Sequence, residues 1–285
     1  TGGSLTAHGG TVTLQSDGSF TYVAANGYEG MDSFTLVASS SGVSASRTVA
    51  LRVSDPTEII GARQNMGQLI LDGQSHAVIP ASGQVAWLGG SDFTMEAWID
   101  PRSLTGTQVI LSKAMGGQSM TLELVGNELC FAAASATQYG NVTSVGANLA
   151  AGQWAHVAVT NQGGSFHLFV NGQEVAATHS FNGTSVSTPN LGFNTSFNPT
   201  TADMWVGQTQ TSNGLPINGF KGSIGEVRLW GYARSAGNIA EMYDEMLDTG
   251  SEGGLVGYWN GTGGSTDLSG NGHDMVLPQA PVAAP

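Results

Sequence analysis

The sequence predicts an all-β fold with one short helix. Three observations support this prediction. Apolar and polar residues alternate with period two along short segments, turn-forming Gly, Asn, Ser and Asp separate these segments, and a single stretch has helical periodicity. The chain has 285 residues, of which 42 are glycine. This length allows one large or two modest domains, and either arrangement is large enough to bury a core.

The first 55 residues predict a small β unit. Short β-type segments at 11–14, 20–22, 32–36 and 49–53 are separated by turn residues, and the series ends at Ser54-Asp55-Pro56. Its landmarks are Gly10-Thr11-Val12, Asp17-Gly18-Ser19-Phe20, Tyr22, Gly30 and Asp32-Ser33-Phe34. In this order they resemble the later strands of the cadherin-like, Ig-like repeats of large bacterial adhesins. Because the opening strands of such a repeat are missing, the resemblance implies a partial repeat over residues 1–55.

Residues 66–278 predict a second, larger β domain. Its clearest strand is Phe93–Asp100, where every second residue is apolar, and Asn171-Gly172 is a strong hairpin signal. The predicted helix covers Ala236–Leu247, with Ser235 as its N-cap. Its apolar stripe consists of Ile239, Met242, Tyr243, Met246 and Leu247.

A set of landmarks runs through this second segment. They are Leu71-Asp72-Gly73, Phe93 to Ile99, Trp154 to Ala158, Phe169-Val170-Asn171-Gly172, Gly222 to Trp230, Gly257-Tyr258-Trp259 and Asp267 to Gly272. In this order they resemble the laminin-G-like and pentraxin group. The resemblance implies a concanavalin A-like β-sandwich, or jelly roll, over residues 66–278. Such sandwiches serve as lectins, adhesion modules and hydrolases, so the fold does not give the function.

The composition limits the possible partners. The chain has 21 acidic against 8 basic residues and a formal net charge of −13, which disfavours nucleic acid as a partner. No apolar run approaches the ~20 residues of a membrane span, so we expect no membrane insertion. The single cysteine, Cys130, cannot form an internal disulfide and is expected to be a small buried side chain. The abrupt start at Thr1 is typical of a module in a longer chain, and we expect this module to be monomeric.

One loop has the spacing of a calcium site. Oxygen-bearing groups recur at Asp267, Ser269, Asn271, the carbonyl of His273 and the adjacent Asp274. Calcium prefers six to eight oxygen ligands, and a tight loop can supply them at alternate positions. An Asn-Gly turn with Asx-type hydrogen bonds explains the same residues equally well. The sequence leaves these two interpretations open.

Polar and aromatic residues in the loops predict carbohydrate binding at one rim of the jelly roll. Sugars are recognised by hydrogen bonds to their hydroxyls and by an aromatic ring under their apolar face. The expected ligand-binding residues are Tyr139 and Phe197 as stacking faces, and Asn194, Gln208, Gln210 and Asn213 as hydrogen-bond partners. The alternative is that such residues are simply common in loops.

A rival location for ligand binding is a sheet face. This face carries Glu96, Trp98, His156, His167 and Glu226, and it would suit a longer chain lying across the sheet. The two histidines are expected to be satisfied within the sheet rather than to bind a metal. Glu226 is expected to pair with Arg228. Because the close carboxylate spacing of glycosidases on this fold is missing, we expect no enzyme.

Taken together, the resemblances imply a section of a secreted bacterial surface adhesin of the RTX type. It would be stabilised by Ca²⁺ and would bind a cell-surface glycan or polysaccharide. Two alternatives remain open: a calcium-rigidified spacer without its own ligand, and a polysaccharide-degrading enzyme.

Overall fold

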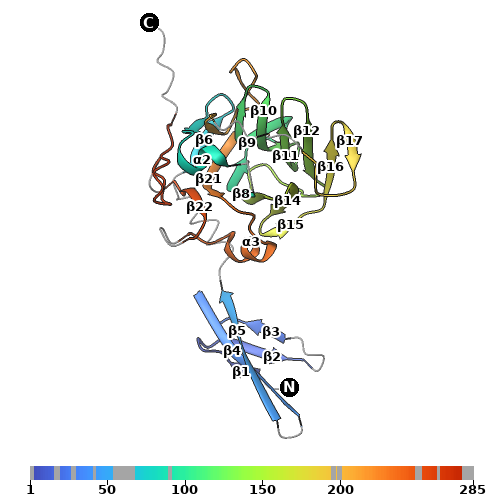
Figure 1. Ribbon diagram of the computed structural model, residues 1–285. Coiled ribbons are helices and arrows are strands. Elements are labelled where there is room, and N and C mark those ends of the chain that lie inside the picture. Colours follow the sequence, from blue (N-terminus) through green and yellow to red (C-terminus); the bar gives the residue numbers. More distant parts are fainter. Residues whose placement is uncertain are drawn as a thin grey trace. The chain divides into compact units, whose positions relative to one another are not determined.

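The chain forms two compact units, Thr1–Asn65 and Met66–Pro285. The computed structural model describes residues 3–15, 20–26, 30–40, 43–53, 68–88, 92–193, 197, 201–247, 252–261 and 264–277. Among these residues strands dominate and helices are few and short, so the predicted all-β fold class is confirmed (Figure 1). None of the helices in the described ranges is both long and apolar enough to cross a membrane.

The first unit contains two small antiparallel sheets. One sheet has the order β1 (Gly3–Leu5), β2 (Thr11–Leu14) and β3 (Phe20–Val23), and the other pairs β4 (Gly30–Ser40) with β5 (Val43–Val53). The two sheets meet where Phe20 packs edge-on against Phe34, with ring centroids 5.0 Å apart. The buried carboxylate of Asp32 on β4 accepts hydrogen bonds from Thr6, the His8 backbone amide and the Tyr22 hydroxyl, which ties this strand to the first sheet.

The second unit is built from two facing sheets. The eight-stranded sheet has the order β17 (Thr184–Val186), β16 (Ala177–Phe181), β12 (Tyr139–Ser144), β11 (Glu128–Ala134), β10 (Gln118–Val125), β9 (Thr107–Met115), β18 (Met204–Val206), β7 (Ala77–Ile79). The seven-stranded sheet has the order β15 (Gln173–Glu174), β14 (Ser165–Val170), β13 (Ala155–Gln162), β8 (Phe93–Pro101), β21 (Lys221–Trp230), β22 (Leu255–Trp259), with β6 (Leu69–Asp72) also paired to β21. A separate hairpin pairs β19 (Thr209–Gln210) with β20 (Pro216–Ile217).

The hydrophobic core of this unit lies between the two sheets. Every second residue of β8, from Phe93 to Ile99, is buried in it, as the period-two alternation predicts. Phe131 on β11 stacks on Phe166 of β14, with ring centroids 5.0 Å apart, and both rings contact Phe93. Cys130 is buried as expected for the single thiol, but on the outer side of β11, away from this core.

Helix α3 (Ala236–Met242) begins where the sequence predicts. The Ser235 side chain caps it by accepting a hydrogen bond from the backbone amide of Asn238 at 3.1 Å. The helix ends at Met242, however, and the prediction that it continues to Leu247 is wrong. The apolar stripe after Met242 therefore continues along irregular backbone.

The early end of α3 has a tertiary cause. The guanidinium of Arg228 donates to the carbonyl of Met242 at 2.8 Å, and the indole of Trp98 donates to the carbonyl of Tyr243 at 2.9 Å. The Met242 carbonyl also accepts from the backbone amide of Glu245 at 3.3 Å, in a tighter turn than a helical one. The side-chain donors thus bond carbonyls that an α-helix would pair with amides four residues further along the chain. As a result Met246, predicted to face the core, is 53% exposed.

A second helix, α2 (Gly83–Trp87), was not predicted from the sequence. Lys113 on β9 points toward it from the core side, and its ammonium donates to the carbonyls of Val85 and Ala86 at 3.0 and 2.9 Å. Burial lowers the pKa of Lys113 to about 8. This lysine caps a helix end and is closed off from any surface.

We predict that Gly222→Ala destabilises the second unit strongly. Gly222 has φ +147°, and a Cβ there would lie 2.1 Å from the carbonyl oxygen of Asp100. Since backbone must move to relieve this contact, we expect the free energy of unfolding to fall by about 3 kcal/mol or more. Gly225→Ala on the same strand is the control, because a Cβ there meets nothing within 4 Å. Urea denaturation of both variants measures the difference, and equal losses would contradict the argument.

Candidate functional site

The central part of the outer face of the seven-stranded sheet is closed to solvent. Ile239 of α3 packs onto Ala158 and Phe169 there, and Glu96 and His156 are both 0% exposed. The rival binding location predicted from the sequence is therefore wrong, because the helix and the residues after it already cover most of that face.

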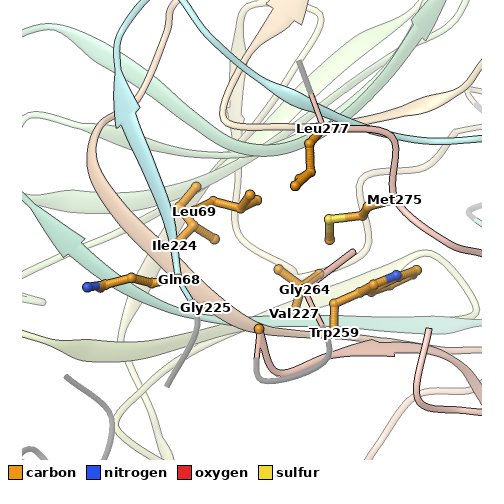
Figure 2. Close-up of a pocket in the computed structure, with 10 residues that line it drawn as sticks. Gln68, Leu69, Ile224, Gly225, Val227, Trp259, Gly264, Met275 and Leu277 are labelled. Atoms are coloured by element: carbon orange, nitrogen blue, oxygen red, sulfur yellow. The ribbon is translucent and has the colours of Figure 1, made fainter. Parts of the chain in front are cut away.

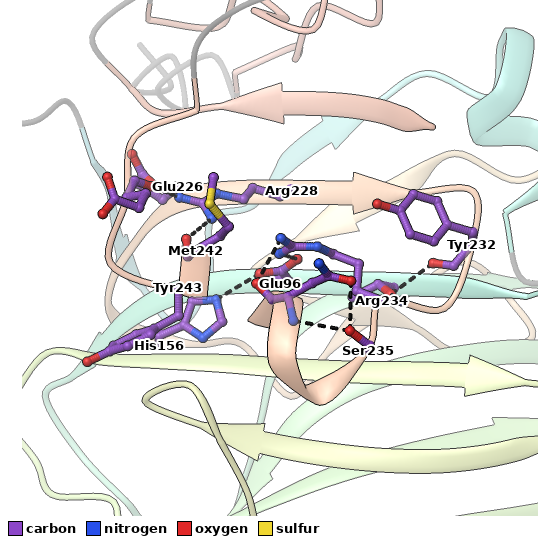
Figure 3. Close-up of polar contacts among 12 residues, drawn as sticks. Glu96, His156, Glu226, Arg228, Tyr232, Arg234, Ser235, Met242 and Tyr243 are labelled. Carbon is purple, nitrogen blue, oxygen red and sulfur yellow. Dashed lines mark hydrogen bonds and ion pairs between the residues drawn. The ribbon is translucent and has the colours of Figure 1, made fainter. Parts of the chain in front are cut away.

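The polar groups under α3 form ion pairs and hydrogen bonds with one another (Figure 3). Glu96 accepts from the guanidinium of Arg234 at 2.8 Å and lies 3.1 Å from the imidazole Nε2 of His156. Burial alone would raise the pKa of Glu96, but the hydrogen bond to His156 and the charge of Arg234 lower it to about 2. Glu96 is therefore an ionised structural group rather than a general acid.

A second buried ion pair lies beside the first. Glu226 and Arg228 form the pair predicted from the sequence, at 2.6 Å, and the hydroxyl of Tyr258 also donates to Glu226 at 3.1 Å. Glu226 has φ +50°, at a point where the register between β21 and β8 shifts. The bulge positions the Glu226 carboxylate against Arg228, and Arg228 in turn donates to the Met242 carbonyl at the end of α3.

The two sheet histidines do not share a site. His156 contacts Glu96, whereas His167 lies 2.7 Å from Glu174 at the edge of the sheet. Each is satisfied by its own carboxylate, as the sequence predicts.

We predict that Glu96→Gln lowers the free energy of unfolding by about 3 kcal/mol at pH 7, because Arg234 would remain buried without its counterion. The pKa of Glu96 is below its ordinary value of 4.5, so its stabilisation is present above that pH and is lost as pH falls toward 2. The difference from wild type should therefore shrink in acid. Glu174→Gln is the control. The ion pair of Glu174 with His167 is exposed, so we expect the free energy of unfolding to fall by less than about 1 kcal/mol. Similar losses in denaturant titrations would contradict the prediction.

The predicted calcium loop is held by its own backbone. One carboxylate oxygen of Asp267 accepts from the backbone amides of Tyr258 and Ser269, both at 3.0 Å, and the other accepts from the amide of His273 at 2.9 Å. Burial would raise the pKa of Asp267, but hydrogen bonds from the Ser269 side chain and from these amides lower it. Both oxygens are thus occupied by N–H donors.

Two other predicted ligands also form hydrogen bonds, to β22 or within the loop. The Asn271 amide donates to the carbonyl of Leu255 at 2.9 Å, and Asp274 accepts from the backbone amide of Asp267 at 2.9 Å. Across the described parts of the chain, no group of three or more His, Cys, Asp or Glu side chains is placed to hold a metal ion. The hydrogen bonds of this loop are those of an Asx-type turn, and the calcium site stays a prediction.

We predict that Asp267→Ala destabilises the unit by about 1–3 kcal/mol even in the presence of a chelator, because three backbone amides lose their acceptor. Thermal melts with chelator and with millimolar calcium measure this. A loss confined to the calcium-loaded protein would instead support the calcium site predicted from the sequence.

An apolar pocket of about 100 Å³ lies beside β6, β21 and β22 (Figure 2). Its side chains are apolar apart from Gln68, and they include Leu69, Ile224, Val227, Trp259, Met275 and Leu277. A ligand site normally adds a few converging polar groups that orient the ligand. This pocket lacks them and is a poor candidate for binding a sugar.

Strand register fixes rows of side chains on the outer face of the eight-stranded sheet, and three of these rows lie side by side in its middle. The first row is Val78, Trp205, Ser112, Thr121, Ala132, Asn141, Ser180 and Ser185. The second is Val109, Glu123, Cys130, Thr143 and Thr178, and the third is Ala114, Ser119, Ala134 and Tyr139. Most of these side chains are small, and many are hydroxyls. We call this surface the polar face.

The polar face is partly open to solvent. Asn141, Thr143 and Ser180 are half-buried, and the Tyr139 ring at one end of the third row is 58% exposed. At the other end of this row, a pocket of about 130 Å³ lies between residues 114–119 and 210–212. With strands spaced by about 4.8 Å, Ala114 and Tyr139 are roughly 14 Å apart, a span suited to a short oligosaccharide.

The structure separates the predicted sugar-binding residues. Tyr139 lies on the polar face, Gln210 lines the pocket and donates to the carbonyl of Ala114 at 2.6 Å, and Asn213 is exposed in the β19–β20 turn. Gln208 is only 3% exposed, and its amide donates to the carbonyl of Gly73. Asn194 lies outside the described residues.

Phe197 needs a correction. The sequence predicts it as a stacking face, but it is 7% exposed and packs against Phe166 and Phe193 in the core. Its apolar ring is therefore buried rather than displayed on a loop.

Sequence reasoning missed most of the polar face. Small or polar residues alternate with apolar ones along β10–β12, for example Thr121, Ala132 and Asn141. That signal was readable, but only the strand register shows that these residues lie side by side.

Comparisons with known proteins match both units. Residues 71–240 match the family described as the Concanavalin A-like lectin/glucanases superfamily, and residues 1–52 match the family described as Bacterial Ig domain. The predicted Ig-like unit is thus confirmed at the level of a bacterial Ig domain. No curated protein matches the chain.

Several solved structures have a similar fold. Domain 4 of AbnA, a GH43 extracellular arabinanase from Geobacillus stearothermophilus in complex with arabinotriose, is 20% identical, with a TM-score of 0.44 over 62% of this chain and 76% of that chain. The Ruminococcus gnavus IT-sialidase CBM40 bound to α2,3 sialyllactose is 14% identical, with a TM-score of 0.44 over 62% and 97%. A putative carbohydrate binding protein from Bacteroides ovatus is 19% identical, with a TM-score of 0.48 over 96% and 78%.

Proposed function

The chain belongs to the Concanavalin A-like lectin/glucanases superfamily, and from this premise we propose that its second unit binds carbohydrate on the polar face. The contrast between the two outer faces supports this most strongly. One face is covered by α3 and its buried ion pairs, whereas the other presents half-buried Asn141, Thr143 and Ser180 to solvent.

The chemistry of the polar face suits a sugar. Hydroxyl and amide side chains can both donate and accept, so they can pair with the hydroxyls of a pyranose. Tyr139 offers an exposed aromatic ring for the apolar face of the sugar. Gln210 and Ser119 line the pocket at the opposite end of the same row, where a second sugar unit can be held.

Binding at such a face should be weak. An open surface buries little of its ligand, so we expect a Kd in the high-micromolar to millimolar range, about −4 to −6 kcal/mol. Repeated copies on a surface would then gain avidity without new contacts.

We propose binding without hydrolysis. Glycosidases of the common type need two carboxyl groups about 5–9.5 Å apart. Within the three described rows of the polar face, Glu123 is the single carboxylate. Glu96 and Glu226 are buried in ion pairs under α3. Release of reducing ends from a polysaccharide would overturn this part of the proposal.

We further propose that the protein works outside the cell, as the ligand-binding region of a bacterial adhesin. The match of residues 1–52 to a bacterial Ig domain and the net charge of −13 support an exported surface protein. The alternative is a spacer without its own ligand, and the next experiment separates the two.

We predict that Tyr139→Ala weakens glycan binding about tenfold, because the sugar loses its stacking surface; tenfold corresponds to about 1.4 kcal/mol. Amide chemical-shift titration with a panel of neutral oligosaccharides measures the change. The matched control is Tyr232→Ala, a 38% exposed tyrosine that packs against Trp230 on the other sheet. It should leave affinity unchanged. No shift with any glycan would favour the spacer, and equal effects of both variants would move the site off the polar face.

A further inference from the structure

One charged side chain lies within the polar face. Glu123 on β10 pairs in register with Val109 on one side and Cys130 on the other, and Thr143 follows in the same row. It is half-buried. Among the described residues, no hydrogen bond or ion pair reaches its carboxylate.

Among the described residues, no basic side chain compensates this carboxylate. In the second unit, Lys113 points to the core side of β9, Arg228 and Arg234 are buried under α3, and Lys221 on β21 and Arg102, which follows β8, lie at the other sheet. None of them is in the three rows. A half-buried carboxylate without a counterion attracts any cation that can reach it, because charge-assisted hydrogen bonds are the stronger ones.

We propose that the polar face selects glycans carrying a free amine over neutral glycans and excludes glycans carrying carboxylates, with Glu123 as the partner of the ammonium group. This inference rests on the proposed function and names the chemical class of its ligand. A sugar ammonium lying across the second row would pair with Glu123 while the hydroxyls of the sugar bond to the half-buried Thr143 and Asn141. A uronate or sialate at the same place would meet like charge with no cation to offset it.

The pH dependence follows from the neighbours of Glu123. On β9 the adjacent residue is Val109, and residues 208–220, which include the β19–β20 hairpin against β9, contain no Asp, Glu, His, Lys, Arg, Cys or Tyr. On β11 the paired neighbour is Cys130, and burial raises the pKa of its thiol to about 12, so it stays neutral. Glu128 lies two residues before Cys130 on β11. Burial would raise the pKa of Glu128, but hydrogen bonds from Ser144 and from the amides of Ala147 and Gly146 lower it, so Glu128 is already charged and held by its own partners. Burial also raises the pKa of Glu123 to about 7. The carboxylate therefore becomes charged, and able to hold an ammonium, as pH rises through 7.

Three trisaccharide probes test the inference. They are a glucosamine trimer with free amines, its N-acetylated form, and a galacturonate trimer. At pH 7 we expect the wild-type protein to bind the amine trimer at least tenfold more tightly than the N-acetylated trimer, and the galacturonate trimer more weakly than both. Lowering the pH to 5 should reduce the amine preference, because Glu123 becomes protonated.

Glu123→Gln should abolish the amine preference and leave the N-acetylated trimer bound as before. Gln keeps the volume and removes a poorly solvated charge, so above pH 7 the variant should melt at the same or a higher temperature. Glu174→Gln, an exposed carboxylate on the other sheet, is the matched control and should retain the preference.

The outcomes test the amine preference separately from carbohydrate binding. If wild type binds the N-acetylated trimer but shows no amine preference, or keeps the preference in Glu123→Gln, the inference is overturned and carbohydrate binding stands. If no probe and no neutral glycan binds, both the inference and the proposed function fail.

Discussion

The burial of the Glu96 carboxylate is the constraint on which the second unit depends. An ionised group cannot remain fully buried without partners, so Arg234 and His156 must lie against it. Arg234 directly precedes α3 and is 140 residues away from Thr94, whose hydroxyl accepts from its backbone amide. Satisfying one carboxylate therefore brings the chain back across the sheet and sets α3 on its outer face.

This placement divides the two outer faces by function. The covered face loses Glu96, Trp98, His156 and Glu226 to structural contacts. The other face keeps its small hydroxyl and amide side chains accessible, because no comparable ion pair draws a helix onto it among the described residues. A covered face thus makes the unit rigid, and the uncovered face is available to a ligand.

The Asp267 loop follows the same rule by a different route. Its carboxylate accepts hydrogen bonds from three backbone amides. Glu123 is an exception, since neither a guanidinium nor a set of amides from the described residues compensates it. A half-buried carboxylate without a compensating partner is a candidate functional group, because such groups concentrate at functional sites.

The sequence by itself determined the features that depend on local pattern. These are the all-β class, the buried alternation of β8, the Ser235 cap, the burial of Cys130 and the pairing of Glu226 with Arg228, which lie two residues apart. Only the tertiary structure decided where α3 ends, that Phe197 is buried, which sheet face is open and that Glu123 has no counterion. Each of these depends on which distant segments become neighbours. The carbonyl of Met242 in α3 accepts a hydrogen bond from Arg228 on β21. The polar face exists only because β9–β12 align in register. Periodicity shows which side chains share a side of one strand, whereas the register and the packing of the helix decide what lies opposite them.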